Sequence, residues 1–268
     1  MPRIMHCPVA LTIAGSDSGG GAGIQADLKT FAAFGVHGAS AIACLTAQNP
    51  RRVYAVESTS PGMLKRQIKA VFSELRPAAV KTGMLFSAES VRVVAGFFHR
   101  QHRVPLIVDP VMVATSGARL LKAEAIKVLK KHLLPLAMLV TPNLPEAEIL
   151  TGGKIANVET MRAAAREIHA RFGCAALVKG GHLRGMREAV DVYFDGRTEL
   201  LLTALFIKGV RTHGTGCTYS AAITAALALG HPLPQAVGLA KNYVTQAIAR
   251  SYRAAGHSAL NHFVAKRK

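Results

Sequence analysis

The sequence predicts an α/β fold, with helices on both faces of a mainly parallel β-sheet. Short apolar, β-branched segments alternate with longer amphipathic segments along most of the 268 residues. Half of the residues are hydrophobic, so a chain of this length can bury a substantial core. The sequence has no linker, low-complexity tract or internal repeat, which favours a single domain over residues 1–268.

The alternation predicts the elements in order. Strands are expected at residues 9–14, 39–45, 53–57, 78–81, 106–109, 138–141 and 175–179. Helices are expected at residues 24–34, 61–75, 87–102, 122–133 and 158–172. Residues 190–194 and 199–207 flank the turn sequence Asp-Gly-Arg-Thr and predict a hairpin at the sheet edge. Helices at 216–229 and 234–253 and a short basic tail complete the chain, whose core is expected to span about residues 8–256.

The composition narrows the class of protein. The chain has 33 Lys and Arg residues against 15 Asp and Glu, a net charge of +18. Such an excess suits nucleic acid, an acidic membrane or an anionic small ligand such as ATP, or it forms a solvated basic surface. A nucleic-acid partner is not expected, because there is no RRM, zinc-finger or bZIP signature and only 6% of the residues are aromatic.

Neither a membrane protein nor a secreted protein is predicted. The longest apolar run, residues 221–229, is about half of the roughly 18–20 residues that a membrane span needs. Residues 1–8 lack the apolar region of a secretory signal. The four cysteines form no CxxC pair and the eleven histidines no pair at zinc-ligand spacing. We therefore expect a cytoplasmic protein with reduced thiols and no zinc site.

Two glycine-rich segments each lie between a predicted strand and a predicted helix. Residues 15–23 (GSDSGGGAG) lack the Gly-Lys-Ser/Thr end of a Walker A loop and the third glycine of GxGxxG. They permit close approach of the backbone to a ligand, or they form a tight turn. Residues 214–217 (GTGC) precede an Ala-rich helix, whose N–H groups and dipole would make an anion hole for a transferring phosphoryl group. Packing alone would also explain these glycines.

Polar side chains follow three of the predicted strands. Asp109 ends a buried strand, where a carboxylate is costly to desolvate without a metal, a phosphate or a capping role. Asn143 and Glu146 supply oxygen ligands suited to Mg²⁺, directly or through water. The same spacing also fits a helix cap, with Asn143 at the N-cap and Glu146 at N3. Lys179 is placed to neutralise a nucleotide phosphate.

Together these motifs resemble the ribokinase superfamily. The similarity is sharpest in GSDSGGGAGIQADLKT (residues 15–30), TAQN (46–49), KTGM (81–84) and THGTGCT (212–218). With these strings the chain is similar, over about residues 8–256, to the hydroxymethylpyrimidine/phosphomethylpyrimidine kinases of thiamine biosynthesis. The resemblance implies a ribokinase-like, three-layer α/β/α fold and a homodimer.

The resemblance also implies an activity and a set of site residues. The family phosphorylates 4-amino-5-hydroxymethyl-2-methylpyrimidine with MgATP, and then phosphorylates the monophosphate to the pyrophosphate. The residues expected to line the pyrimidine pocket are Gly15, Asp27, Gln48 and Met84. Those expected to face the nucleotide and its Mg²⁺ are Asp109, Asn143, Glu146, Lys179 and Thr212, with Asp109 and Glu146 nearest the metal, directly or through water. Those expected to act on the transferring group are Gly214, Thr215, Gly216 and Cys217.

Cys217 is the expected base. Sugar kinases of this superfamily carry a catalytic Asp at this place, and no Asp or Glu follows Glu199 in the chain. A thiol at a helix N-terminus can have its pKa lowered, so Cys217 would serve as base. The alternative is a small side chain that only fills space.

Three other functions remain to be weighed. A pyridoxal or pyridoxine kinase of the same superfamily is the nearest alternative. Gln48 within Ala-Gln-Asn favours the aminopyrimidine instead, because its side-chain amide offers both a donor and an acceptor to the edge of the aminopyrimidine ring. The others are a basic nucleic-acid-binding protein on a kinase-like fold and a regulatory module that binds the pyrimidine without turnover. The presence of Asp109, Glu146 and Lys179 argues against both.

Overall fold

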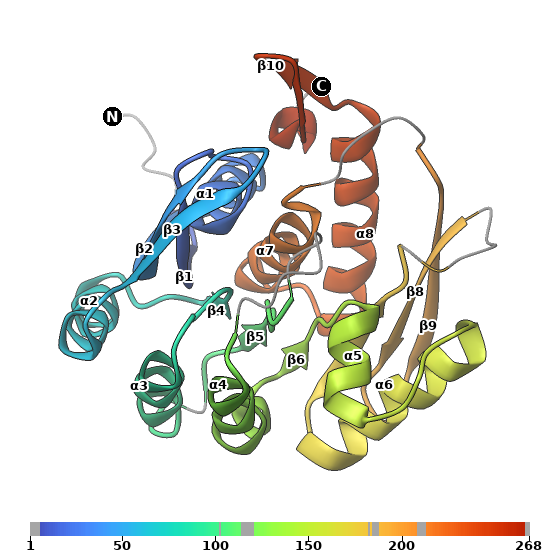
Figure 1. The fold of residues 1–268 in the computed structure, drawn as a ribbon, viewed down its shortest axis with the longest axis horizontal. Helices are drawn as coiled ribbons and strands as arrows, with labels where there is room; N and C mark the ends of the chain where they lie inside the picture. The colour runs from blue at the N-terminus through green and yellow to red at the C-terminus, as the bar shows by residue number, and fades with distance from the viewer. Residues whose placement is uncertain are drawn as a thin grey trace.

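The computed structural model describes residues 6–101, 103–113, 121–181, 183, 188–207 and 213–265. Within these residues, nine strands form one sheet in the order β3-β2-β1-β4-β5-β6-β7-β8-β9 (Figure 1). The strands are β1 (Val9–Asp17), β2 (His37–Gln48), β3 (Val53–Ser58), β4 (Ala79–Thr82), β5 (Leu106–Val108), β6 (Leu139–Val140), β7 (Ala175–Lys179), β8 (Glu188–Phe194) and β9 (Glu199–Leu205). The α-helices are α1 (Gly23–Ala33), α2 (Pro61–Glu74), α3 (Ala88–Phe98), α4 (Ala123–Val128), α5 (Leu144–Thr151), α6 (Val158–Phe172), α7 (Thr215–Ala228) and α8 (Leu233–Ala249).

The sheet is mainly parallel, as predicted. Strands β2, β1, β4, β5, β6 and β7 pair in parallel, whereas β3 at one edge and β8 and β9 at the other are antiparallel. Chain order reverses direction across the sheet between β1 and β4. In open parallel sheets such a switch point leaves a crevice at the carboxyl ends of the strands.

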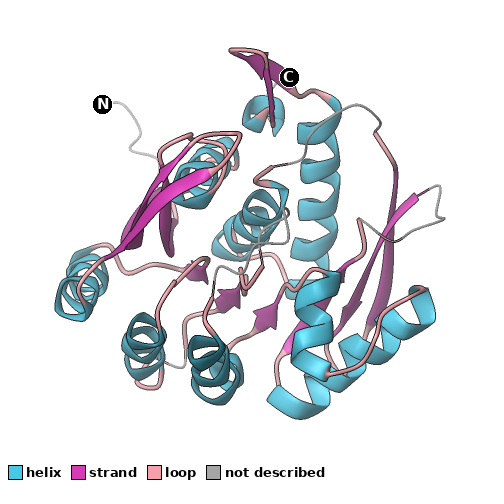
Figure 2. Ribbon diagram, viewed as in Figure 1, coloured by secondary structure: helices cyan, strands magenta, loops and turns pink. Residues whose placement is uncertain are grey.

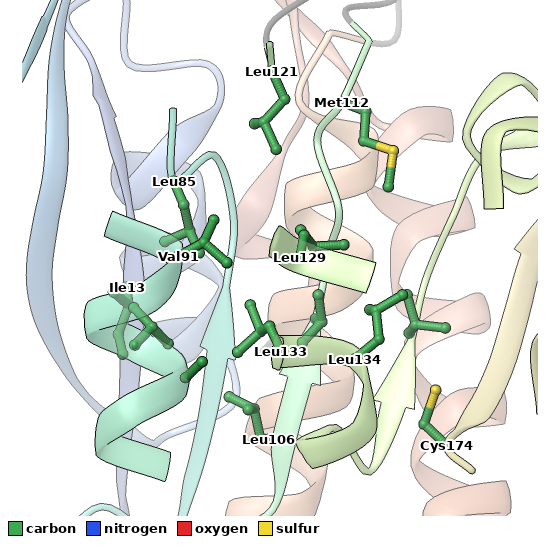
Figure 3. Close-up of a cluster of buried hydrophobic side chains, with 14 of the residues drawn as sticks. Ile13, Leu85, Val91, Leu106, Met112, Leu121, Leu129, Leu133, Leu134 and Cys174 are labelled. Atoms are coloured by element: carbon green, nitrogen blue, oxygen red, sulfur yellow. The ribbon is translucent and has the colours of Figure 1, made fainter. Parts of the chain in front are cut away.

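Helices cover both faces of the sheet, which makes three layers (Figure 2). Alternate residues of a strand face opposite sides, so Leu106 and Val108 of β5 pack into one core and Ile107 into the other. The first core includes side chains of α2, α3, α4 and α6, and Figure 3 shows part of it around Leu129 and Leu133. The second core lies under α7 and α8 and includes Ile223.

The structure also departs from the predicted elements. The predicted helix 122–133 is α4 followed by a π-helical turn, Leu129–Leu133, and a 3₁₀ turn, Leu134–Leu136. The short helix α5 was not among the predicted helices. Among the described residues, no helix is long and apolar enough to cross a membrane.

The largest departure is at the C-terminal end, where only a tail was expected. Helix α8 ends at Ala249, and the chain then forms a hairpin of β10 (Tyr252–Ala254) and β11 (His257–Ala259) and a 3₁₀ turn, His262–Ala265. Ala255 and Gly256 both have positive φ, the conformation of a two-residue hairpin turn. An Ala-Gly turn lacks the Asn-Gly or Asp-Gly signature, so the sequence pattern gave no signal for it.

Candidate active site

A cavity of about 670 Å³ lies at the carboxyl ends of the central strands, at the switch point of the sheet. Its volume is within the range of small-molecule sites. Both glycine-rich segments contribute to its wall. The predicted site residues that line it are Gly15, Gln48, Met84, Asp109, Asn143, Glu146, Lys179, Gly214, Gly216 and Cys217.

The two glycine-rich loops pack directly against each other. Gly214 has a φ of +82°, and a Cβ atom there would overlap the carbonyl oxygen of Gly21. A Cβ atom at Gly216 would lie 3.2 Å from Lys179 Nζ. Any larger residue at either position would push the loops apart or displace the lysine. The first turn of α7 therefore lies against a cation, and the helix dipole adds further positive potential there.

Lys179 and Asp109 form a buried ion pair at the wall of the cavity. The lysine Nζ donates to Asp109 Oδ1 at 3.1 Å, and the hydroxyls of Thr141 and Ser220 donate to the same carboxylate, each at 3.3 Å. Burial opposes the charge of Lys179, but the carboxylates of Asp109 and Glu146 raise its pKa above the ordinary value. The amino group is therefore charged and available to an incoming phosphate.

Asn143 and Glu146 form a capping box at the start of α5. Asn143 Oδ1 accepts the N–H of Glu146 at 2.9 Å, and Glu146 Oε2 accepts the N–H of Asn143 at 2.9 Å. Glu146 Oε1 accepts the N–H of Met112 at 2.9 Å. Burial raises the pKa of Glu146 to about 7, although Lys179 opposes this shift. The helix-cap interpretation is thus correct, and the same two residues also line the cavity.

The carboxylates of Asp109 and Glu146 fit a magnesium ion that arrives with a nucleotide. In the described part of the chain there is no cluster of three or more His, Cys, Asp and Glu side chains able to hold a metal alone. Mg²⁺ is commonly bound by one or two carboxylates, with phosphates and waters completing its shell. Two hard oxygen donors beside Lys179 match that pattern.

Gly15, Gln48 and Met84 also line the cavity. A Cβ atom at Gly15 would be 2.7 Å from Cys44 Sγ and 3.0 Å from Met84 Cε, so only glycine leaves this space open. The Nε2 atoms of Gln48 and His213 lie 3.2 Å apart.

Asp17 and His213 belong to the site but were not singled out from the sequence. Asp17 accepts the N–H groups of Gly19, Gly21 and Ala22 at 2.8, 3.1 and 2.8 Å, so the first glycine-rich loop folds around its carboxylate. His213 Nε2 is 3.5 Å from Asp17 Oδ2. Burial opposes ionisation of Asp17, yet His213 and the N–H groups lower its pKa. Both residues lie inside the quoted motif strings, which was the available signal.

Asp27 does not line the cavity, contrary to the prediction. Its carboxylate is fully buried, accepts the hydroxyl of Thr12 at 2.6 Å and forms an ion pair with Lys81 at 2.7 Å. Helix α1 directs this side chain into the sheet instead of the crevice. Both carboxylate oxygens thus have protein partners.

The prediction of a lowered thiol pKa at Cys217 is wrong. Burial raises the pKa of Cys217 to about 12, although the cation of Lys81 opposes the shift. Burial and the carboxylates of Asp27 and Asp109 outweigh Lys81 and the N–H of Gly23. Thr215 begins α7, beside Gly214 and Gly216, and Thr212 lies outside the described residues.

Comparison with known proteins shows which family the chain resembles over most of its length. The profile of a family described as phosphomethylpyrimidine kinase matches residues 17–261. A hydroxymethylpyrimidine/phosphomethylpyrimidine kinase of Rhizobium meliloti is 51% identical over 259 residues, which cover 95% of this chain and 97% of that protein.

Two further matches differ in length and in name. The thiamine biosynthesis bifunctional protein ThiED of Geobacter sulfurreducens is 48% identical over 95% of this chain, which spans only 52% of that protein. Among solved structures, an ADP complex of Bacillus subtilis pyridoxal kinase has a TM-score of 0.89 and 36% identity, covering 96% of this chain and 98% of that one.

Proposed function

The chain belongs to the phosphomethylpyrimidine kinase family, and from this premise we propose that it transfers the γ-phosphoryl group of ATP to 4-amino-5-hydroxymethyl-2-methylpyrimidine. The same site then phosphorylates the monophosphate to the pyrophosphate for thiamine biosynthesis. One observation carries the proposal: a single cavity is lined both by Gln48 and by Gly214, Gly216, Cys217 and Lys179.

Lys179 and the start of α7 support a role in binding and aligning ATP. Phosphoryl transfer depends mostly on positioning and on stabilising charge on the transferred group. Lys179 and the N–H groups at the start of α7 supply positive potential, and Asp109 and Glu146 would hold Mg²⁺, directly or through water. When bound, the metal neutralises charge on the phosphate oxygens.

Gln48 supports recognition of the aminopyrimidine. The amide of Gln48 offers a donor and an acceptor to a ring nitrogen and an exocyclic amine. His213, which contacts both Gln48 and Asp17, limits the orientations of that amide. The hydroxymethyl group would then point toward the phosphates held by Lys179 and the start of α7.

The two phosphorylation steps differ in whether a base must remove a proton from the acceptor. In the first, the hydroxyl oxygen forms a bond to the γ-phosphorus, the bond from that phosphorus to the bridging oxygen of ADP breaks, and the hydroxyl proton passes to the thiolate form of Cys217. In the second, the acceptor is a phosphate monoester with a second pKa near 6, so it is already an anion at neutral pH. The thiolate is therefore needed only for the first step.

The oligomeric state and compartment follow from the same resemblance. We expect a homodimer in the cytoplasm, acting on small molecules. Light scattering on the purified protein tests the first expectation, and a mass of a single chain of 28.4 kDa would contradict it.

The experiment that tests the function is a time course. Purified protein is incubated with hydroxymethylpyrimidine and MgATP, and the monophosphate and pyrophosphate are followed by chromatography. Sequential appearance of both products is expected; turnover of neither substrate would overturn the proposal.

Pyridoxal kinase is the second candidate. The similarity to the Bacillus subtilis enzyme favours it, because that structure carries this name. Parallel assays with pyridoxal and hydroxymethylpyrimidine separate the two, and a higher kcat/KM for the pyrimidine is expected.

A further inference from the structure

Two adjacent arginines lie at the wall of the cavity, outside every motif used so far. Arg51 and Arg52 occupy the turn between β2 and β3 and follow the sequence Gln48-Asn49-Pro50. Both are exposed and both line the same cavity as Gln48, Lys179 and Gly216. Such a turn presents long cationic side chains to whatever enters the site.

The turn is held in place by hydrogen bonds. Asn49 Oδ1 accepts the N–H groups of Arg51 and Arg52 at 2.9 and 3.1 Å, and Asn49 N donates to the carbonyl of Arg52 at 3.1 Å. Ser18 joins this turn to the first glycine-rich loop, because its hydroxyl donates to Gln48 O at 2.7 Å and accepts from Gln48 N at 2.8 Å. The backbone that carries the arginines is therefore fixed to the first glycine-rich loop at the wall of the cavity.

Within the described residues, the guanidinium groups of Arg51 and Arg52 are not paired with carboxylates of the protein. The guanidinium of Arg52 lies 4.2 Å from the ring centroid of Tyr54, a contact that orders the side chain and leaves its donors open. Lys179, in contrast, is already paired with Asp109.

The charges around the cavity show what the arginines are needed for. Asp17, Asp109 and Glu146 line it, and Lys179 is the lysine that faces them. A second phosphorylation brings a phosphate monoester, nearly dianionic at neutral pH, to within bonding distance of the ATP phosphates. Among the described lining residues the one lysine, Lys179, is already offset by the carboxylate of Asp109, so the acceptor requires additional cations.

We propose that Arg51 and Arg52 form a subsite for the phosphate of a phosphorylated pyrimidine, and so set the preference of the enzyme for its second substrate over its first. The proposal rests on the proposed function and adds to it the residues that separate the two steps. Arg is suited to this role because its planar group donates two parallel hydrogen bonds to phosphate oxygens.

The test compares the double variant Arg51→Gln/Arg52→Gln with wild type on both substrates. The ratio of KM for the monophosphate to KM for the alcohol is expected to rise about tenfold or more, as for the loss of one or two charge-assisted hydrogen bonds. The rise is expected to shrink in high salt, which screens exposed charges. Arg51→Lys/Arg52→Lys is expected to recover part of the ratio, because the charge remains while the two-pronged geometry is lost.

A matched control makes the same change of charge elsewhere. Arg100→Gln/Arg103→Gln removes two exposed arginines that precede β5, at the amino ends of the strands and so at the opposite edge of the sheet. It is expected to leave the ratio at the wild-type value. An equal rise in this control, or an unchanged ratio in Arg51→Gln/Arg52→Gln, would overturn the proposal.

Binding of the monophosphate without ATP separates this proposal from the proposed function. Calorimetry is expected to give a weaker Kd in Arg51→Gln/Arg52→Gln by a similar factor. If wild type turned over neither substrate, the proposed function alone would fail, and the two Kd values would still decide the subsite. Equal Kd values for wild type and double variant would overturn it.

Discussion

Two of the three buried Lys–Asp pairs among the described residues have the same chemistry and different surroundings. Lys81 and Asp27 have no exposed side-chain surface, lie 2.7 Å apart and sit beneath the cavity. Lys179 and Asp109 lie 3.1 Å apart at the cavity wall, with 14% and 4% of their side chains exposed. In both pairs burial opposes the charge of the lysine and the partner carboxylate raises its pKa.

The difference between the pairs is what remains available to a ligand. The carboxylate of Asp27 is used by Lys81 and Thr12, so the first pair is closed. Within the described residues, the amino group of Lys179 makes one side-chain hydrogen bond, to Asp109. Its remaining donors lie beside Gly216 and the open cavity. A closed pair fixes the arrangement of helix and sheet, whereas an open pair can exchange its partner for a phosphate.

The largest expected effect is on catalysis at the open pair. Lys179→Met removes the cation nearest the start of α7, so kcat/KM for both substrates is expected to fall by about 10³-fold or more. Steady-state kinetics with each acceptor measure it. Lys154→Met, at a lysine that is 92% exposed, is the control and is expected to retain wild-type activity. If the fall in kcat/KM of Lys179→Met were fully explained by the fraction of the variant that is unfolded, Lys179 would have no role in binding the nucleotide.

Substitution in the closed pair, Lys81 and Asp27, is expected to affect the stability of the fold more than catalysis. Lys81→Met leaves the Asp27 carboxylate buried without its cation and should lower the free energy of unfolding by about 3–5 kcal/mol. Urea titration measures the change. The double variant Asp27→Leu/Lys81→Met removes both charges and is expected to recover much of that loss. If the double variant were as unstable as the sum of the two single ones, the pair would not act as a unit.

Cys217 tests the asymmetry between the two phosphorylation steps. Cys217→Ala is expected to lower kcat/KM about 10²-fold for the alcohol, the usual size of a general-base contribution, and less than threefold for the monophosphate. Because burial raises the pKa of the thiol to about 12, the thiolate fraction grows tenfold per pH unit up to that value. The first step should therefore accelerate between pH 8 and 10 in wild type, while the second stays level. Equal losses in both steps would remove Cys217 from the role of base.

The layered fold and the position of the cavity could be predicted, because both follow from patterns that are visible in short stretches of the sequence. Alternation of strands and helices dictates a parallel sheet, and glycines and polar residues after strands mark its carboxyl edge. Asp27 could not be distinguished from Asp109 in this way. Both occur in polar motifs, but Asp27 lies on α1 and points into the sheet, whereas Asp109 directly follows β5 and lines the cavity.

The pKa of Cys217 and the C-terminal hairpin were missed for a related reason. A helix N-terminus predicts a lowered thiol pKa only if burial and nearby carboxylates do not outweigh it, and tertiary packing determines both. Tertiary contacts also fix the segment after α8: Leu260 is 3% exposed, and Asn261 N donates to Ala247 O at 3.1 Å. Neither contact leaves a periodic pattern in the sequence.

The smallest effect is expected at a third closed site, which joins this C-terminal segment to α7. His262 is 4% exposed; its Nε2 lies 3.0 Å from Thr218 Oγ1, and its carbonyl accepts the hydroxyl of Tyr243 at 2.7 Å. Burial lowers the pKa of His262 to about 4, and the nearby cation of Lys29 acts in the same direction.

The sign of the pH dependence at His262 follows from that shift. Between about pH 6.5 and pH 4 the unfolded chain binds a proton that the folded chain does not, so stability falls as the pH falls. From pH 7 to pH 5.5 this group should remove roughly 1 kcal/mol of the free energy of unfolding. His262→Gln should flatten the slope by that amount, measured by urea titration at each pH. Thr218→Val loses the hydrogen bond but keeps the titrating ring, so it should lower stability while retaining the slope. A wild-type slope in His262→Gln would show that the ring is as easily protonated in the folded chain as in the unfolded one, and the segment would then be open and not closed.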